Sequence, residues 1–234
     1  MKNIMIITGA NKGIGAAIAQ KFLTENWRVI NIARGAEHKD AIEKINCDLA
    51  DLTQLEKKIK ELLPSLQDAK KISLVHNASW HGKDTIKNIQ TDAFLQSLTV
   101  NLIAPNILNQ ILIPQMPSSS SIIYLGSTLS EKAVPGAASY VIDKHAIVGM
   151  MRATCQDLAA EQIHTCCVCP GFTNTEMLQK HLAHDPELLK SVSARVGANR
   201  LIEPSEIADV AFFAANNPVI NGSVIHANLG QIES

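Results

Sequence analysis

The stretch TGANKGIG, residues 8–15, decides the fold, because it follows the first short apolar run of the chain and opens the first amphipathic stretch. A glycine-rich turn between a strand and a helix is typical of a unit that binds a dinucleotide. Gly9 allows a sharp turn, Gly13 lets the backbone approach a pyrophosphate, and Gly15 lets the helix pack closely on the strand. The free amides and the positive helix end would receive the phosphates. An ordinary strand-to-helix turn is the alternative.

Short apolar runs rich in β-branched residues recur along the chain, with longer amphipathic stretches between them. Most of these runs lack alternation between apolar and polar residues, which indicates strands buried on both faces. The order strand, helix, strand then predicts an α/β fold of the Rossmann type, a doubly wound, seven-stranded parallel sheet flanked by helices on both faces. The expected strands are residues 3–7, 28–32, 45–47, 72–76, 121–125, 164–169 and 224–226, and the expected helices are residues 13–25, 52–63, 91–113, 139–161 and 205–215.

Length and composition limit the choices further. The 234 residues are 46% apolar, enough for one substantial core, and no linker interrupts them, so we expect a single domain over residues 1–234. With 21 Lys and Arg against 22 Asp and Glu, and 4% aromatic residues, the chain lacks the basic field and stacking rings of a nucleic-acid binder. No apolar run approaches the ~18 residues that cross a bilayer, and none forms a signal-peptide core, so we expect no membrane partner and a cytoplasmic location.

The five cysteines are an odd number, and Cys166, Cys167 and Cys169 crowd one apolar run without a partner cluster elsewhere. This pattern favours reduced thiols. The nearest histidine, His164, lies on the same short run, where strand geometry suits chelation poorly. The sequence therefore predicts no metal site.

The run after the first helix indicates which dinucleotide is bound, because its end meets the adenosine ribose. An acidic residue there would accept hydrogen bonds from a free 2′-hydroxyl. Here residues 29–34 carry no carboxylate at the tip, and Lys12 lies in the nearby turn. Arg34 and Lys12 would bind a 2′-phosphate, which favours NADP or NADPH over NAD. The alternative is that both are solvated surface cations.

Tyr140 and Lys144 are four residues apart on an expected helix, so their side chains share one face, with Cβ atoms ~6 Å apart. A cation ~6 Å from a phenol stabilises the phenolate by about 2.8 kcal/mol at an effective dielectric of ~20, which suits proton transfer near neutral pH. Ser127 follows an expected strand and would hold a substrate oxygen at the carboxyl edge of the sheet. Asn101 is a polar residue among apolar neighbours of an expected helix, for which a capped bend or a buried amide is the alternative.

Together these residues resemble the short-chain dehydrogenase/reductase family over almost the whole chain. The resemblance rests on residues 8–15, Asp48, Asn77-Ala78-Ser79, Asn101, Ser127, Tyr140 with Lys144, Pro170-Gly171 and Thr175, in that order and spacing. It implies that Asn101, Ser127, Tyr140 and Lys144 form a catalytic tetrad. The expected cofactor-binding residues are Gly9, Asn11, Lys12, Gly13, Ile14, Gly15, Arg34, Asp48, Leu49, Asn77, Ala78, Ser79, Tyr140, Lys144, Pro170, Gly171, Thr173 and Thr175.

The resemblance also implies individual roles. Asp48 and Leu49 would contact adenine, and Thr173 and Thr175 would hold the nicotinamide carboxamide. Lys144 would also bind the nicotinamide ribose. The segment 173–200 is expected to form a lid over the substrate.

The family commonly pairs through its two long helices, so we expect a homodimer or homotetramer. Ile147, Met150 and Ala153 would extend an apolar surface for this pairing. The chain departs from the family pattern at three places: His76 and Ser79 around Asn77-Ala78, Thr173 where Val or Ile is usual, and residues 227–230 near the C-terminus.

The expected activity is that of an NADP(H)-dependent oxidoreductase, which reversibly reduces a ketone or aldehyde to an alcohol. Hydride passes from the nicotinamide to the carbonyl carbon, Ser127 polarises the oxygen, and Tyr140 delivers the proton. One alternative is a catalytically silent NADP-binding sensor or scaffold protein, and another is an epimerase or dehydratase. The small-molecule substrate is not identified, and its expected pocket walls are Trp80, Leu129, Pro135, Met177 and Leu178.

Overall fold

The structure is a computed structural model that describes residues 2–35, 41–182 and 185–231. Seven strands form one sheet in the order β3-β2-β1-β4-β5-β6-β7, and every neighbouring pair is parallel. The predicted Rossmann-type sheet is therefore confirmed. The strands are β1 (Lys2–Thr8), β2 (Arg28–Ala33), β3 (Glu43–Asn46), β4 (Ala69–His76), β5 (Ser121–Leu125), β6 (His164–Pro170) and β7 (Ser223–Ala227).

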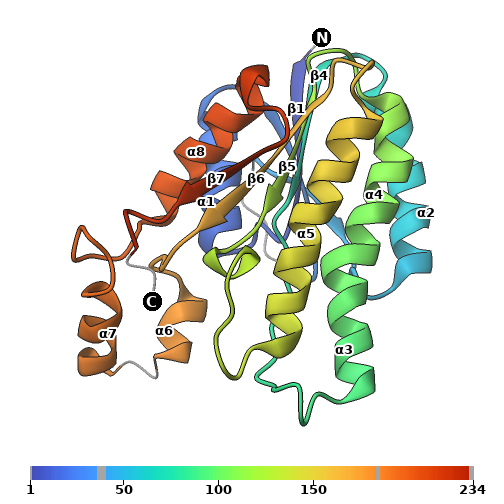
Figure 1. Cartoon of the computed structure of the whole chain (residues 1–234). Helices are drawn as coiled ribbons and strands as arrows, with labels where there is room; N and C mark the ends of the chain where they lie inside the picture. The colour runs from blue at the N-terminus through green and yellow to red at the C-terminus, as the bar shows by residue number, and fades with distance from the viewer. Residues whose placement is uncertain (1, 36–40, 183–184, 232–234) are drawn as a thin grey trace.

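Helices cover both faces of the sheet (Figure 1). α1 (Gly13–Thr24) and α8 (Pro204–Asn216) lie on one face, and α2 (Leu52–Leu62), α4 (Ala104–Leu112) and α5 (Ala138–Asp157) lie on the other. The sheet is therefore buried from both sides, which is why its strands lack polar alternation. The remaining helical segments are α3 (Thr91–Leu98), α6 (Glu176–His181), α7 (Pro186–Ser193) and the short 3-10 turns η1 (Leu63–Leu66), η3 (Ile113–Gln115), η4 (Thr128–Ser130) and η5 (Pro218–Ile220).

A separate apolar core lies under each helical layer. Phe22 and Ile207 belong to the core under α1 and α8. Leu108 and Met151 belong to the core under α2, α4 and α5. Since each helix layer buries its own set of strand side chains, the sheet is anchored on both faces and its carboxyl edge is held in place.

One expected helix, residues 91–113, is divided in the structure. A π-helical turn, η2 (Thr99–Ile103), separates α3 from α4 and carries Asn101. Pro105 has no backbone N–H, so it cannot donate the hydrogen bond that the carbonyl of Asn101 would receive in a regular α-helix. A π-helical turn widens the helix locally and occurs often at functional sites. The sequence marks Asn101 as a polar residue among apolar neighbours, but it does not predict this turn.

The strands share one direction, so all their carboxyl ends meet at one edge of the sheet. β1 and β4 are neighbours at the position where the strand order reverses. The turn after β1 and the segment after β4 therefore diverge there, which is where open α/β sheets bind ligands. α6 and α7 stand beyond this edge, outside the helical layers (Figure 1). They belong to the expected lid, of which residues 183–184 lie outside the described part of the chain.

On α5, Lys144, Val148 and Met151 are buried against the rest of the protein. Ile147 was expected on an outer apolar surface, but it is 5% exposed and belongs to the core, so that prediction was wrong. Met150 is partly buried against the same core, and Ala153 is exposed. α5 packs against α3 and η2 as well as the sheet, and a helix with neighbours on several sides buries more than one narrow stripe.

Three global features bear on function. All five cysteines are unpaired and buried. Over the described ranges, no group of three or more His, Cys, Asp or Glu side chains is arranged to hold a metal ion. No helix in that part of the chain combines the length and apolar character needed to cross a membrane.

Candidate active site

The glycine turn joins β1 to α1 at the carboxyl edge. Gly9 and Gly13 have φ angles of +73° and +59°, which glycine adopts without strain. At Gly15 a Cβ would overlap the side-chain amide of Asn77 and lie 2.5 Å from the carbonyl oxygen of Gly9. The N-cap of α1, Lys12, makes no side-chain cap within the described structure, so the first amides of α1 are available to an anion.

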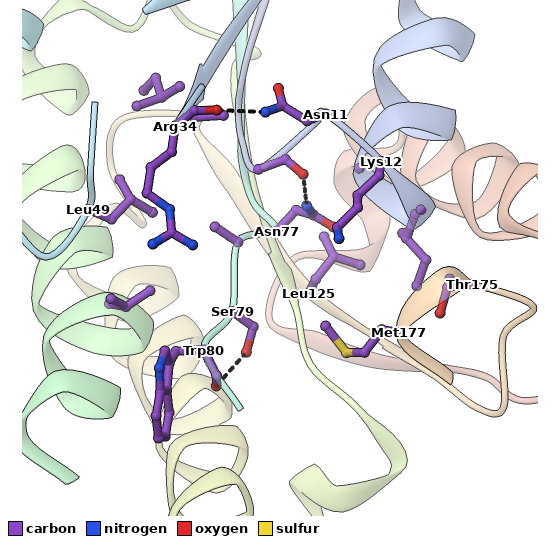
Figure 2. Close-up of a pocket in the computed structure, with 18 of the residues that line it drawn as sticks. Asn11, Lys12, Arg34, Leu49, Asn77, Ser79, Trp80, Leu125, Thr175 and Met177 are labelled. Atoms are coloured by element: carbon purple, nitrogen blue, oxygen red, sulfur yellow. Dashed lines mark hydrogen bonds between the residues drawn. The ribbon is translucent and has the colours of Figure 1, made fainter. Parts of the chain in front are cut away.

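A chain of amide groups ties the glycine turn to β2. The backbone N–H of Ala10 donates to Oδ1 of Asn31 at 2.9 Å, and Nδ2 of Asn31 donates to Oδ1 of Asn11 at 2.9 Å. Nδ2 of Asn11 then donates to the carbonyl oxygen of Arg34 at 2.8 Å (Figure 2). Asn31, which is 4% exposed, was not among the residues predicted from the sequence. A polar residue inside a buried strand was the available signal, because such a group needs a partner.

Thr8 and Asn77 tie the same turn to β4. The backbone N–H groups of Asn77 and Ala78 donate to Oγ1 of Thr8 at 3.1 and 3.0 Å. Nδ2 of Asn77 donates to the carbonyl oxygens of Thr8 and Gly9, both at 3.0 Å. The ends of β1 and β4 are thus fastened to each other beside the turn.

A cavity of about 450 Å³ lies at this edge, a size typical of small-molecule sites. It runs from Arg34 and Leu49 to Thr175 and Met177 (Figure 2). The predicted site residues that line it are Gly9, Asn11, Lys12, Gly13, Ile14, Gly15, Arg34, Asp48, Leu49, Asn77, Ala78, Ser79, Tyr140, Lys144, Pro170 and Thr175. Asn101, Ser127, Gly171 and Thr173, although described, are not among its lining residues.

The cavity is also lined by residues that sequence reasoning did not select. Ala33, Cys47 and Leu125 lie at or just after strand ends, and the rule that ligands bind at carboxyl ends could have found them. Gln96 and Val100 come from α3 and η2. Nothing in their local sequence marked them, because their position follows from how the divided helix packs.

Of the five residues expected to form the walls of the substrate pocket, all of which the structure describes, two line the cavity and three do not. Trp80 and Met177 line the cavity. Leu129, Pro135 and Leu178 do not, within the described structure. The sequence shows which segments reach the carboxyl edge, but it does not show which of their side chains turn inward.

Lys12 and Arg34, the two cationic side chains predicted to bind a 2′-phosphate, extend from different sides of the cavity (Figure 2). Nζ of Lys12 lies 3.3 Å from Oε2 of Glu176, and Nη1 of Arg34 lies 3.7 Å from Oδ2 of Asp48. Hydrogen bonds from Lys180 and Lys12 lower the pKa of Glu176. Both cations are mostly exposed, with 66% and 77% of their side-chain surfaces open to water. Such exposed pairs are weak, so either cation can exchange its carboxylate for a phosphate.

Tyr140 and Lys144 project from α5 into the cavity. Nζ of Lys144 lies 5.4 Å from the centre of the Tyr140 ring, as the one-face spacing predicted. Lys144 is 7% exposed, and its ammonium group donates to the carbonyl oxygen of Leu125 at 2.7 Å. An ammonium group has three N–H donors, so two remain for ligands. The ring of His81 meets the Tyr140 ring edge-on, with centroids 4.6 Å apart.

The hydroxyl groups of Ser127, Thr173 and Thr175 make different hydrogen bonds. The N–H of Leu129 donates to Oγ of Ser127 at 3.1 Å, so this bond does not consume the hydroxyl hydrogen of Ser127. Oγ1 of Thr173 donates to the carbonyl oxygen of Gly171 at 3.0 Å, and Thr173 is 6% exposed. Its hydroxyl is thus committed to the backbone. Thr175 caps α6 by accepting from the N–H of Leu178 at 3.3 Å, and it also lines the cavity.

Asn101 lies behind the cavity wall and is 6% exposed. The N–H of Trp80 donates to its Oδ1 at 2.7 Å, and its Nδ2 donates to the carbonyl oxygen of Trp80 at 2.9 Å. These two hydrogen bonds to the backbone of Trp80 fix the segment that follows β4. Ser79 and Trp80, from that segment, line the cavity.

Comparisons with known proteins agree with this geometry. A family model described as enoyl-(acyl carrier protein) reductase matches residues 9–231. The 3-oxoacyl-[acyl-carrier-protein] reductase FabG of Staphylococcus aureus is 27% identical over 98% of both chains. A short chain dehydrogenase family protein from Francisella tularensis has a TM-score of 0.86 at 26% identity, over 98% of both chains. A putative NAD(P) dependent gluconate 5-dehydrogenase from Beutenbergia cavernae, with bound NADP, has a TM-score of 0.87 at 26% identity, over 97% and 96%. The chain therefore belongs to the short-chain dehydrogenase/reductase family of oxidoreductases.

Proposed function

We propose that this protein is an NADP(H)-dependent oxidoreductase that interconverts a ketone or aldehyde and the corresponding alcohol. The observation that carries the proposal is that Tyr140 and Lys144 line the same cavity as the glycine turn. A pair able to move a proton thus meets a turn suited to a dinucleotide. The relatives named as a reductase and a dehydrogenase support the same reaction class.

The described residues fit a dinucleotide. The N-cap of α1 makes no side-chain capping hydrogen bond within the described structure, and Gly13, Ile14 and Gly15 of its first turn line the cavity. We assign the pyrophosphate to this position, the adenosine to the end near Arg34 and Leu49, and the nicotinamide to the end near Tyr140. Bound NADPH would supply the hydride at that end.

The residues of the chain would manage the proton and the substrate oxygen. Tyr140 donates its proton to the carbonyl oxygen, and Ser127 donates a hydrogen bond to the same oxygen. Lys144, held by the carbonyl oxygen of Leu125, places its ammonium group beside the phenol and has N–H groups that can bind the ribose. By family resemblance, Asn101 orients a water that returns protons through Lys144.

The proposed preference for NADP rests on charge at the adenosine end. Arg34 reaches the cavity with its guanidinium, and the described end of β2 has no carboxylate in the place that would bind a free ribose hydroxyl. The solved relative with bound NADP supports the same preference. Lys12 would add charge once a phosphate draws it from Glu176.

The assembly and location belong to the same proposal. We expect a homodimer or homotetramer acting in the cytoplasm on a small-molecule substrate. The unpaired thiols fit a reducing compartment. Light scattering at micromolar concentration checks the assembly: a strict monomer would contradict it.

The test is a screen of carbonyl compounds by NADPH absorbance, with acetoacetyl-CoA, butanedione and an aldose as probes. With a probe that is reduced, Tyr140→Phe is expected to lower turnover by roughly 10²- to 10⁴-fold, because the proton donor is lost. NADPH affinity should change by less than about 3-fold, since the hydroxyl of Tyr140 is only one of many expected contacts with the cofactor. The other tyrosine, Tyr124, is buried in the core, so Tyr124→Phe is the matched control and should keep wild-type turnover per folded molecule.

The screen also separates the alternatives. Wild-type turnover in Tyr140→Phe would contradict the mechanism. Tight NADPH binding without consumption of any probe would favour a sensor or scaffold protein instead.

A further inference from the structure

Three polar side chains are buried together where α5 packs against the divided helix. Ser97, Asn101 and Asp143 are 0%, 6% and 1% exposed. Oδ2 of Asp143 accepts a hydrogen bond from Nδ2 of Asn101 at 2.6 Å and another from the hydroxyl of Ser97. A carboxylate removed from water is costly unless it is well bonded, and this one lies between Tyr140 and Lys144 on the same helix.

The amide of Asn101 has a single orientation. Its Oδ1 faces the N–H of Trp80, so its Nδ2 must face the opposite partners. One Nδ2 hydrogen is donated to the carbonyl oxygen of Trp80 at 2.9 Å, and the other is donated to Asp143 at 2.6 Å. Asn101 therefore bridges the α5 carboxylate and the segment after β4.

We propose that Asp143 is a positioning residue for the reaction proposed above, on which this inference rests. Its carboxylate holds Asn101, and through Asn101 it holds the wall at Trp80 in register with Tyr140 and Lys144. The two sides of the nicotinamide end come from α5 and from the segment after β4. The Asp143–Asn101–Trp80 chain is a direct polar link between them.

The hydrogen bonds of the carboxylate distinguish a substitution that keeps them from substitutions that lose them. Burial raises the pKa of Asp143, against hydrogen bonds from Ser97 and Asn101 that lower it. Both bonds fall on Oδ2, and Oδ1 has no hydrogen-bond partner among the residues that the structure describes. Asparagine can place its oxygen at the position of Oδ2 and keep both bonds. Alanine and serine are too short to reach either donor.

The first experiment measures turnover of a probe that the wild type reduces. Asp143→Ala, or Asp143→Ser if alanine prevents folding, is expected to lower kcat by about 10-fold or more with NADPH affinity within about 3-fold, because the wall moves while the glycine turn stays. Asp143→Asn should keep at least about a third of wild-type kcat, since it keeps the acceptor. Asp157→Ala, at the exposed end of α5, is the matched control and should match wild type.

A double-mutant cycle identifies the route. If Asp143 acts through Asn101, then Asp143→Ala should lower kcat by less than about 2-fold in an Asn101→Ala background. A merely structural role would lower thermal stability and would leave the two effects on kcat additive. Additive effects would overturn the inference.

The second experiment needs no substrate. Hydrogen exchange at the Trp80 amide should become at least about 10-fold faster in Asp143→Ala or Asp143→Ser, because its acceptor Asn101 loses its support. Asp143→Asn and Asp157→Ala should keep wild-type protection. Unchanged protection in the alanine and serine variants would overturn the inference, whatever the activity.

Failure of the proposed function looks different. An inactive wild type, or an active Tyr140→Phe, would refute the reaction, while exchange at Trp80 still decides whether Asp143 holds Asn101. An active wild type with an inactive Tyr140→Phe and a fully active Asp143→Ala would refute the role of Asp143 alone.

Discussion

The two ends of the cavity are held by different kinds of contact. At the proposed cofactor end, Thr8, Asn31 and Asn77 fasten the glycine turn by hydrogen bonds of 2.9–3.1 Å. At the other end, where α6 belongs to the proposed lid, α6 meets that turn through the exposed Lys12–Glu176 pair, and Met177 is 51% exposed. The cofactor end is therefore set by the folded backbone, whereas water can replace the contacts of the lid. Substitutions at the first end should lower NADPH affinity or stability strongly, and substitutions at the second end should change them little.

Gly15→Ala is expected to have the largest effect. A Cβ there would displace Asn77 and the carbonyl of Gly9, so NADPH affinity should fall by about 100-fold or more and stability by roughly 1–3 kcal/mol. Calorimetry of NADPH binding and urea unfolding measure both. Gly149→Ala is the matched control, since no atom lies within 4 Å of the added Cβ. It should stabilise α5 by about 0.5–1 kcal/mol. Normal NADPH binding by Gly15→Ala would mean that the turn is not rigid.

A buried polar chain joins the end of β4 to α4 and β5. Nε2 of His76 bonds Oδ1 of Asn109 at 2.9 Å, and Nδ2 of Asn109 donates to the hydroxyl of Tyr124 at 2.8 Å. Because Oδ1 can only accept, the proton of the imidazole is on Nε2. Nδ1 of His76 has no partner among the described residues, so protonation there is unfavourable.

The second-largest expected effect is therefore a loss of stability in acid, caused by His76. Burial lowers the pKa of His76 from 6.5 to about 4. The unfolded chain takes up this proton near pH 6.5 and the folded chain only near pH 4, so the stability conferred by neutral His76 is present above pH 6.5 and lost as pH falls toward 4. The loss is at most about 3 kcal/mol.

Urea unfolding of the wild type and of His76→Gln, measured across this pH range, isolates the contribution of His76 to stability. His164, whose pKa burial also lowers, is present in both proteins and cancels. Identical pH dependence of the two proteins would show that His76 does not stay neutral in the folded state.

Arg34→Ala should have a smaller and more selective effect. Loss of the guanidinium should lower the preference for NADPH over NADH by about 10-fold, because a 2′-phosphate loses its charged partner. The matched control is Arg28→Ala, at the other end of β2, where Arg28 pairs with Glu43 at 2.7 Å. Unchanged preference in Arg34→Ala would place the phosphate elsewhere.

Glu176→Gln should have the smallest effect. The Lys12–Glu176 pair is exposed on both sides, so KM for NADPH and for substrate should each change by less than about 3-fold. Steady-state kinetics measures both. A change above about 10-fold would mean that this pair holds the lid, and the contrast between the two ends would fail.

The same contrast explains what the sequence could predict. The glycine turn was predictable because backbone geometry and close packing allow only glycine at Gly9, Gly13 and Gly15. Tyr140 and Lys144 were predictable because helical spacing alone brings them together. Such local rules predicted residues that the structure brings together on one cavity.

Contacts between distant segments were not predictable in this way. Asn31 and Asp143 act on partners 20 or more residues away, at separations of 21 and 42. The π-helical turn at Asn101 depends on packing against α5 as well as on Pro105. The substrate walls depend on side-chain directions within exposed segments, which leave no periodic pattern.

The most direct test of the central claim follows the hydride itself. NADPH carrying deuterium at the reactive carbon of its nicotinamide would be mixed with the probe that the wild type reduces, and the alcohol analysed by mass spectrometry. The account predicts deuterium on the carbinol carbon with the wild type, and deuterated alcohol formed at least about 100-fold more slowly with a Tyr140→Phe protein that still binds NADPH. Deuterated alcohol formed by Tyr140→Phe at the wild-type rate would contradict it.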